Sequence, residues 1–130
     1  MTLLGGDLTE RTSLTDSTME YLNSFLDLSS FSTLWSLGNH DTYDNQDRIM
    51  NYTKRNTFYT HYQDRNTFIV LNNQLEDGLI KNEQLWMIED IADTISESDN
   101  LILLQHKLMW MDKHPQLAPL MSTIPNGGAG

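Results

Sequence analysis

The sequence predicts an α/β fold, in which short apolar strands alternate with amphipathic helices. Three observations predict it. Apolar segments of strand length end at polar side chains at three places, and two longer segments repeat apolar residues at helical spacing. Two strand-like segments also flank a short polar turn. The length of 130 residues is typical of one domain, and the composition predicts a flexible tail from about residue 122 to residue 130.

The first half of the chain predicts a strand, a helix and a second strand. Leu3-Leu4 ends the first strand, and residues 8–13 read as a polar loop. Residues 33–37 are an apolar strand, whereas residues 41–56 are polar without a clear period, which predicts a loop. The helix is expected over residues 15–28, with an N-terminal cap at Thr15, Asp16 or Ser17 and apolar positions at Met19, Leu22, Phe25 and Leu26.

The second half predicts a hairpin, a helix and a strand. Residues 58–62 and 67–71 are the two strands of the hairpin, joined by a turn over residues 63–66. Asp77-Gly78 is a turn signal in the loop that follows, and residues 101–105 form a last strand. The intervening helix is expected over residues 82–95, with a core-facing set of Leu85, Trp86, Met87, Ile88, Ile91, Ala92 and Ile95.

The composition excludes several classes of function. Eight Lys and Arg residues against 18 Asp and Glu residues give a formal charge of -10, which argues against a general nucleic-acid binder. This charge is compatible with a phosphate substrate, because bound divalent cations dominate the charge of such a site. The chain has no cysteine, which removes thiolate chemistry, and no segment is apolar enough to predict a transmembrane span. Oligomeric state and compartment stay open.

Three motifs follow predicted strands. They are Gly5-Gly6-Asp7, Gly38-Asn39-His40-Asp41 and His106. In open α/β sheets, ligands bind outside the carboxyl ends of strands. Each motif also has an ordinary structural explanation, as a turn or cap at Asp7, a surface turn at His40 and a strand end at His106. Their order and their common position after strands predict a metal-dependent hydrolase.

This order resembles the calcineurin-like metallophosphoesterases. The family signature has five blocks, namely Asp-x-His, Gly-Asp, Gly-Asn-His-Asp/Glu, a lone His and Gly-His-x-His, and the chain contains the middle three. The segment Glu83-Gln84-Leu85-Trp86 also resembles a helix start found in many members. The resemblance implies a layered β-sandwich flanked by helices. It also implies that residues 1–130 are a single partial domain, incomplete at both ends.

The resemblance assigns metal ligands residue by residue. Asp7 matches the aspartate that bridges two ions, and Asn39 and His106 match two ligands of the second ion. The complete family site holds two divalent ions, and the mixture of carboxylate, amide and imidazole ligands favours Mn, Fe or Zn. The remaining ligands of the family site belong to the first and last blocks.

The resemblance also implies catalytic residues. His40 matches the histidine that contacts the phosphate or protonates the leaving oxygen, which imidazole can do near neutral pH. Asp41 is expected to fix the loop or orient its neighbours. Glu10 and Arg11 are similar to an Asp-Arg pair of the related protein phosphatases, which implies that Glu10 orients His40 and that Arg11 binds phosphate through a bidentate contact.

The implied function is metal-dependent hydrolysis of a phosphomonoester or phosphodiester. The resemblance implies a phosphoester substrate that is either a small molecule or a phosphoprotein. Because only part of the signature is present, we expect the 130-residue chain to be weakly active or inactive alone. The alternative is a catalytically inactive phosphate-binding or protein-interaction module derived from the same fold.

Overall fold

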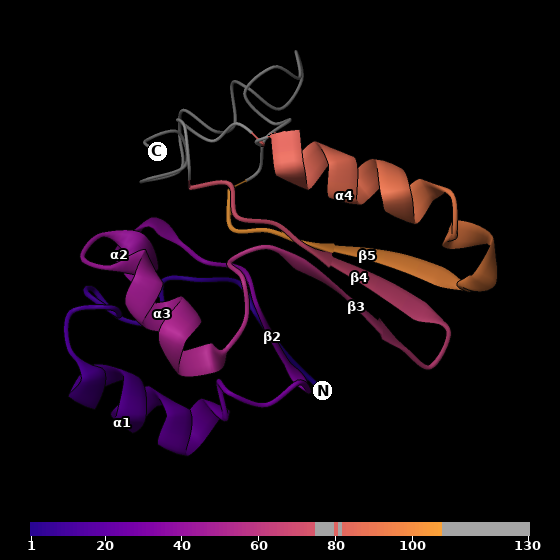
Figure 1. Cartoon of the computed structure of the whole chain (residues 1–130). Helices are drawn as coiled ribbons and strands as arrows, with labels where there is room; N and C mark the ends of the chain where they lie inside the picture. Colours follow the sequence, from indigo (N-terminus) through magenta and orange to yellow (C-terminus); the bar gives the residue numbers. More distant parts are fainter. Residues whose placement is uncertain (75–79, 81, 108–130) are drawn as a thin grey trace, which may run out of the picture.

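The computed structural model describes residues 1–74, 80 and 82–107. Within this part the chain is a mixed α/β structure with two sheets and four α-helices, which confirms the predicted class (Figure 1). The two sheets contain two and three strands. The predicted turn at Asp77-Gly78 and the predicted tail over residues 122–130 lie outside the described residues. No helix of the described part is long and apolar enough to cross a membrane.

The predicted strand–helix–strand unit is present. Strands β1 (Thr2–Leu4) and β2 (Thr33–Trp35) are parallel neighbours, and α1 (Asp16–Leu26) connects them. Thr15 caps α1 by accepting a 3.1 Å hydrogen bond from the Thr18 amide, as predicted. The helix ends two residues before the predicted end, because Asp27 takes a left-handed conformation.

The expectation of a loop over residues 41–56 is wrong. Helices α2 (Asn39–Thr42) and α3 (Gln46–Thr53) lie there. Asn45 caps α3 by accepting a hydrogen bond from the Arg48 amide, and Ile49 buries itself in the core. Only one strong apolar residue of this segment is fully buried, which explains why the helical period was not visible in the sequence.

The predicted hairpin is confirmed. Strands β3 (Tyr59–Gln63) and β4 (Asn66–Val70) are antiparallel, and β5 (Asn100–Leu104) pairs with β4 in parallel. Asp64 and Arg65 form the turn with φ values of 52° and 61°, and two successive positive φ angles are typical of a tight type I′ turn. The order of the sheet is β3-β4-β5.

Helix α4 (Asn82–Ala92) lies along one face of the three-stranded sheet, and a single 3₁₀ turn, η2 (Ile95–Glu97), follows it (Figure 1). The predicted core-facing set is wrong in part, because Trp86 is 60% exposed and Leu85 is 44% exposed. The buried residue is Gln84, whose side chain hydrogen-bonds the main chain of Asn72 at both its N–H and its C=O, at 2.9 Å each. This polar anchor turns Gln84 inward and leaves Trp86 at the surface.

Two apolar clusters form the core. The first joins α1, β2 and α3, and the second joins Leu34 of β2 to Phe68 and Val70 of β4. The second cluster therefore connects the two sheets. Phe25, expected on the apolar side of α1, is instead 68% exposed and makes an edge contact with Tyr21. The buried members of the first cluster are Met19, Leu22, Leu28, Trp35, Leu37 and Ile49.

Candidate functional site

The ends of three strands bring the predicted motifs together. Asp7 follows β1, His40 follows β2 and His106 follows β5. The Asp7 Oδ2 atom lies 3.3 Å from His106 Nε2, and Asp7 Oδ1 accepts a 2.9 Å hydrogen bond from the His40 amide. The carboxylate of Asp7 thus stands between the two other motifs. Asn39 lies next to His40 at the start of α2 and is exposed.

The tautomer of His106 is set by the main chain of Gly5. The Nδ1 atom of His106 lies 2.6 Å from the Gly5 carbonyl oxygen, and a carbonyl oxygen can only accept a hydrogen bond. Nδ1 therefore carries the proton, and the lone pair of Nε2 faces Asp7 Oδ2. Two acceptors this close require a positive charge between them, supplied either by a proton on Nε2 or by a cation.

A divalent cation fits this pair of atoms. Carboxylate and imidazole ligands lie about 2.0–2.2 Å from a transition-metal ion, so two ligands of one ion can be 3.3 Å apart. A histidine ligand commonly donates its other ring N–H to a carbonyl, as His106 does to Gly5. Among residues 1–74, 80 and 82–107, no three His, Asp or Glu side chains gather around one point.

Glycines allow the close approach of these groups. Gly6 has a φ of 94°, and a Cβ atom there would lie 2.5 Å from the Gly38 amide nitrogen and 2.7 Å from His106 Nδ1. A Cβ atom at Gly38 would lie 2.0 Å from Asp7 Oδ1, whereas one at Gly5 would meet nothing within 4 Å. The turn therefore depends on Gly6 and Gly38.

Asp41 is the buried anchor of the site. Its side chain has no exposure, and Oδ2 accepts hydrogen bonds from the amides of Asp7, at 2.7 Å, and Gly38, at 2.8 Å. Oδ1 accepts from the Leu8 amide at 3.0 Å and from the Thr12 hydroxyl at 2.6 Å. One carboxylate therefore ties the loop after β1 to the loop after β2.

His40 is exposed and is held from behind by the loop after β1. Its Nδ1 atom lies 2.8 Å from the Glu10 carbonyl oxygen, so Nδ1 donates and Nε2 is the unprotonated nitrogen when the ring is neutral. The Thr12 amide also donates to the His40 carbonyl at 3.2 Å. The resemblance implied orientation by the carboxylate of Glu10, but in the structure the main chain of Glu10 makes the contact.

Arg11 has partners that the sequence did not reveal. Its guanidinium donates to both carboxylate oxygens of Asp44, with an Nε–Oδ2 distance of 3.2 Å, and lies 5.8 Å from the centre of the Tyr43 ring. The hydrogen bond and the charge of Asp44 raise the pKa of Arg11. Asp44 accepts from the Nε and Nη2 atoms of Arg11. The Nη1 atom is therefore the one that can donate to another anion.

Asn73 is a further residue that sequence reasoning missed. Its side-chain amide donates to the Lys107 carbonyl at 2.5 Å and accepts from the Lys107 amide at 3.2 Å. This two-way contact fixes the main chain next to His106. The only available signal was the position of Asn72-Asn73 directly after a strand, which is also where the other motifs lie.

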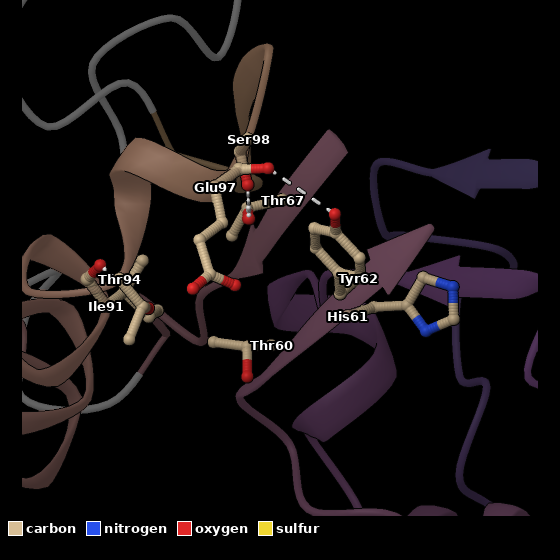
Figure 2. A pocket seen from close by; sticks show the side chains of 8 residues that line it. All are labelled: Thr60, His61, Tyr62, Thr67, Ile91, Thr94, Glu97 and Ser98. Carbon is tan, nitrogen blue, oxygen red and sulfur yellow. Dashed lines mark hydrogen bonds between the residues drawn. The ribbon is translucent and has the colours of Figure 1, made fainter. Parts of the chain in front are cut away.

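A separate hollow of about 240 Å³ lies between α4, η2 and the β3–β4 hairpin (Figure 2). None of the predicted site residues lines it. Two hydrogen bonds join polar groups of its lining, since the Thr67 and Ser98 hydroxyls are 2.6 Å apart and Tyr62 donates to the Glu97 carbonyl at 3.5 Å. The side chain of His61 points away from Glu97 in Figure 2. The hollow is therefore independent of the site around Asp7.

Comparison with known proteins gives one match. A family model described as calcineurin-like phosphoesterase matches residues 1–123. No curated protein and no solved structure matches the chain. The match covers the three motifs that contact one another around Asp7. The chain therefore belongs to the calcineurin-like phosphoesterase family, whose members are typically hydrolases that act on phosphoesters and generally use divalent metal ions.

Proposed function

We propose that this chain contributes a metal-binding half-site and a phosphate-facing histidine to the hydrolysis of a phosphomonoester or phosphodiester. The observation that carries the proposal is the 3.3 Å approach of Asp7 Oδ2 and His106 Nε2, with His106 Nδ1 bonded to Gly5. This arrangement directs a carboxylate oxygen and an imidazole nitrogen toward one point. The family of the chain supports the same chemistry in general terms.

Each residue has a proposed role. Asp7 and His106 would hold a divalent ion together with the amide oxygen of Asn39, and the carboxylate of Asp7 could also serve a second ion. Bound ions of this kind neutralise phosphate charge and make water a better nucleophile. Mn, Fe and Zn match this mixture of oxygen and imidazole ligands.

His40 is the proposed contact to the substrate. Its amide donates to Asp7 and its Nδ1 donates to Glu10, so the ring is fixed with Nε2 toward solvent. In the protonated state Nε2 can donate to a phosphate oxygen or give its proton to the leaving oxygen. Asp41 acts through the loops that it joins, as a positioning residue.

The proposed architecture places this half-site at the edge of a layered β-sandwich. Leu34 of β2 packs against Phe68 and Val70 of β4, which supports two sheets facing one another. Parallel pairing of β1 with β2 supports the common direction in which Asp7 and His40 leave their strands.

Metal stoichiometry tests the half-site. The purified chain is incubated with Mn²⁺, freed of excess ion and measured by elemental mass spectrometry. We expect about one ion per chain, and we expect Asp7→Asn and His106→Gln to lose it, because the first removes the negative charge of the carboxylate and the second removes the imidazole nitrogen. His61→Gln is the matched control, since His61 lies on β3 outside the site. A folded chain without bound ion, or equal binding by all variants, contradicts the proposal.

Turnover distinguishes the enzyme from the inactive module. With Mn²⁺ present, we expect slow hydrolysis of 4-nitrophenyl phosphate or its bis ester, and we expect His40→Gln to lower the rate about a hundredfold or more while Mn²⁺ stays bound. A wild-type chain that binds Mn²⁺ and phosphate without turnover, and that is unchanged by His40→Gln, supports the module instead.

A further inference from the structure

An exposed aromatic side chain stands beside the proposed site. Tyr43 follows α2 directly, continues its helical conformation and is 78% exposed. Residues three and four apart on a helix are neighbours on its surface, with Cβ atoms roughly 5–6 Å apart. Tyr43 is three residues from His40 and four from Asn39. It is therefore a neighbour of both the proposed substrate contact and the proposed ligand.

The ring is fixed from one side. The guanidinium of Arg11 lies 5.8 Å from the ring centre, within the range of a cation–π contact. Arg11 is held in turn by Asp44, whose side chain is only 12% exposed and accepts at both oxygens. A carboxylate with so little exposure favours keeping its partner, because an unpaired buried charge is costly. Asp44 thus holds Arg11, and Arg11 in turn contacts the ring of Tyr43. The high exposure of Tyr43 leaves part of the ring surface available to another group.

The loop that carries Arg11 is the one that holds His40. Glu10 contacts His40 Nδ1 and Thr12 contacts the His40 carbonyl, so the residues on both sides of Arg11 are attached to His40. The loop after β1 therefore contacts both the ring of Tyr43, through Arg11, and the imidazole of His40, through Glu10. These contacts fix the position of the Tyr43 ring relative to the His40 imidazole.

The geometry points to Tyr43 as the surface on which a planar aromatic part of the substrate stacks while its phosphate lies at His40. This inference rests on the proposed function and adds a substrate class, a phosphoester that carries an aryl group or a nucleobase. Aromatic stacking is favourable for any ring with a π-face. An alkyl or sugar phosphate gains nothing comparable from the same surface.

Ligand-observed NMR titration in the presence of Zn²⁺ tests the inference with two pairs of probes. Phenylphosphonate and methylphosphonate share the anionic group and differ in the ring. Adenosine 5′-monophosphate and ribose 5-phosphate, measured before hydrolysis is detectable, differ in the nucleobase. The first pair reports an aryl group and the second a nucleobase. In the wild type, we expect at least one aromatic probe to bind about fivefold more tightly than its partner.

Variants of Tyr43 distinguish an effect of its aromatic ring from an effect on the folded structure. Tyr43→Ala should remove the preference for the aromatic probe and leave methylphosphonate binding within about twofold, whereas Tyr43→Phe should keep the preference. Tyr21→Ala is the matched control, because Tyr21 is an exposed tyrosine on α1. Tyr43 is exposed, so its replacement should not unfold the chain.

The outcomes are distinguishable. Equal binding within both pairs, or a preference that survives in Tyr43→Ala, overturns the stacking surface while the proposed phosphate site stands. Absence of binding by all four probes removes the phosphate site itself, and the stacking surface with it. A preference for phenylphosphonate alone identifies an aryl substrate, and a preference for the nucleotide identifies a nucleobase.

Discussion

Asp41 accepts a 2.7 Å hydrogen bond from the main-chain amide of Asp7, although 34 residues separate them. The carboxylate of Asp41, the last residue of Gly38-Asn39-His40-Asp41, thus holds the main chain of Asp7, the last residue of Gly5-Gly6-Asp7. Asp7 itself takes a left-handed conformation with a φ of 54°, which is uncommon for a residue with a side chain. The buried carboxylate of Asp41 therefore helps to hold a strained proposed ligand in position.

Replacing Asp41 should lower the stability of the fold. In Asp41→Ala, three main-chain amides and one hydroxyl lose their acceptor, and buried unsatisfied donors cost about 1–3 kcal/mol each. We expect the free energy of unfolding, measured by urea denaturation, to fall by about 3 kcal/mol or more. Glu89→Ala on the exposed side of α4 should change it by less than about 0.5 kcal/mol. A loss as small as that of the control would show that Asp41 does not join the loops.

Gly38→Ala should damage metal binding. The added Cβ atom would lie 2.0 Å from Asp7 Oδ1 and 2.7 Å from the Asp7 amide nitrogen, so Asp7 must shift from its position beside His106. We expect the dissociation constant for Mn²⁺ to rise about tenfold or more in a metal titration. Gly5→Ala is the matched control, because a Cβ atom there meets nothing within 4 Å. Equal effects of the two substitutions would contradict the crowding at Gly38.

Gln84→Leu should destabilise the packing of α4. The leucine fills similar space but leaves the N–H and C=O of Asn72 without the partners that Gln84 provides at 2.9 Å. We expect the free energy of unfolding to fall by about 2 kcal/mol. Glu83→Ala, one residue earlier and exposed, should cost only a few tenths. If Gln84→Leu were stabilising, apolar packing would outweigh the lost hydrogen bonds.

The pH dependence of the Arg65–Asp99 pair has a definite sign. The hydrogen bond from Arg65 lowers the pKa of Asp99 below 3.8, and the two side chains meet at 2.7 and 2.8 Å. A lowered carboxylate pKa stabilises the fold above the unfolded value of 3.8, and this stabilisation is lost as pH falls through the folded pKa. We expect Arg65→Gln to raise the Asp99 midpoint in an NMR titration of the carboxyl carbon. Lys54→Gln, at the end of α3, should leave that midpoint unchanged.

Local signals in the sequence predicted much of the fold. The Thr15 cap, the turn at Asp64-Arg65 and the apolar strands depend on neighbouring residues, so their patterns are visible without the fold. Helix α3 was missed because its one buried strongly apolar residue, Ile49, packs against distant elements. Helix α2 was missed because it is a short helix whose buried residue, Asp41, bonds the distant main chain of Asp7 and Leu8. Local pattern carries little information about such tertiary contacts.

The site was predictable as a set of motifs and not as a geometry. The motifs placed Asp7, His40 and His106 after strands, and the structure brings them within contact distance. The anchoring of Arg11 by Asp44 and the contact of Asn73 with Lys107 join residues 33 and 34 positions apart. No local pattern marks such pairs, and the exposed position of Trp86 was hidden for the same reason.

The hydrogen bond from His106 to Gly5 joins residues that are 101 positions apart in the chain. The free-energy cost of closing a loop grows with its length, so this contact is among the last that a folding chain can form cheaply. During synthesis, Asp7 emerges from the ribosome long before His106 does. The two side chains can meet only after the intervening strands have assembled, so capture of an ion by this pair would report completion of folding and would stabilise the finished structure by mass action.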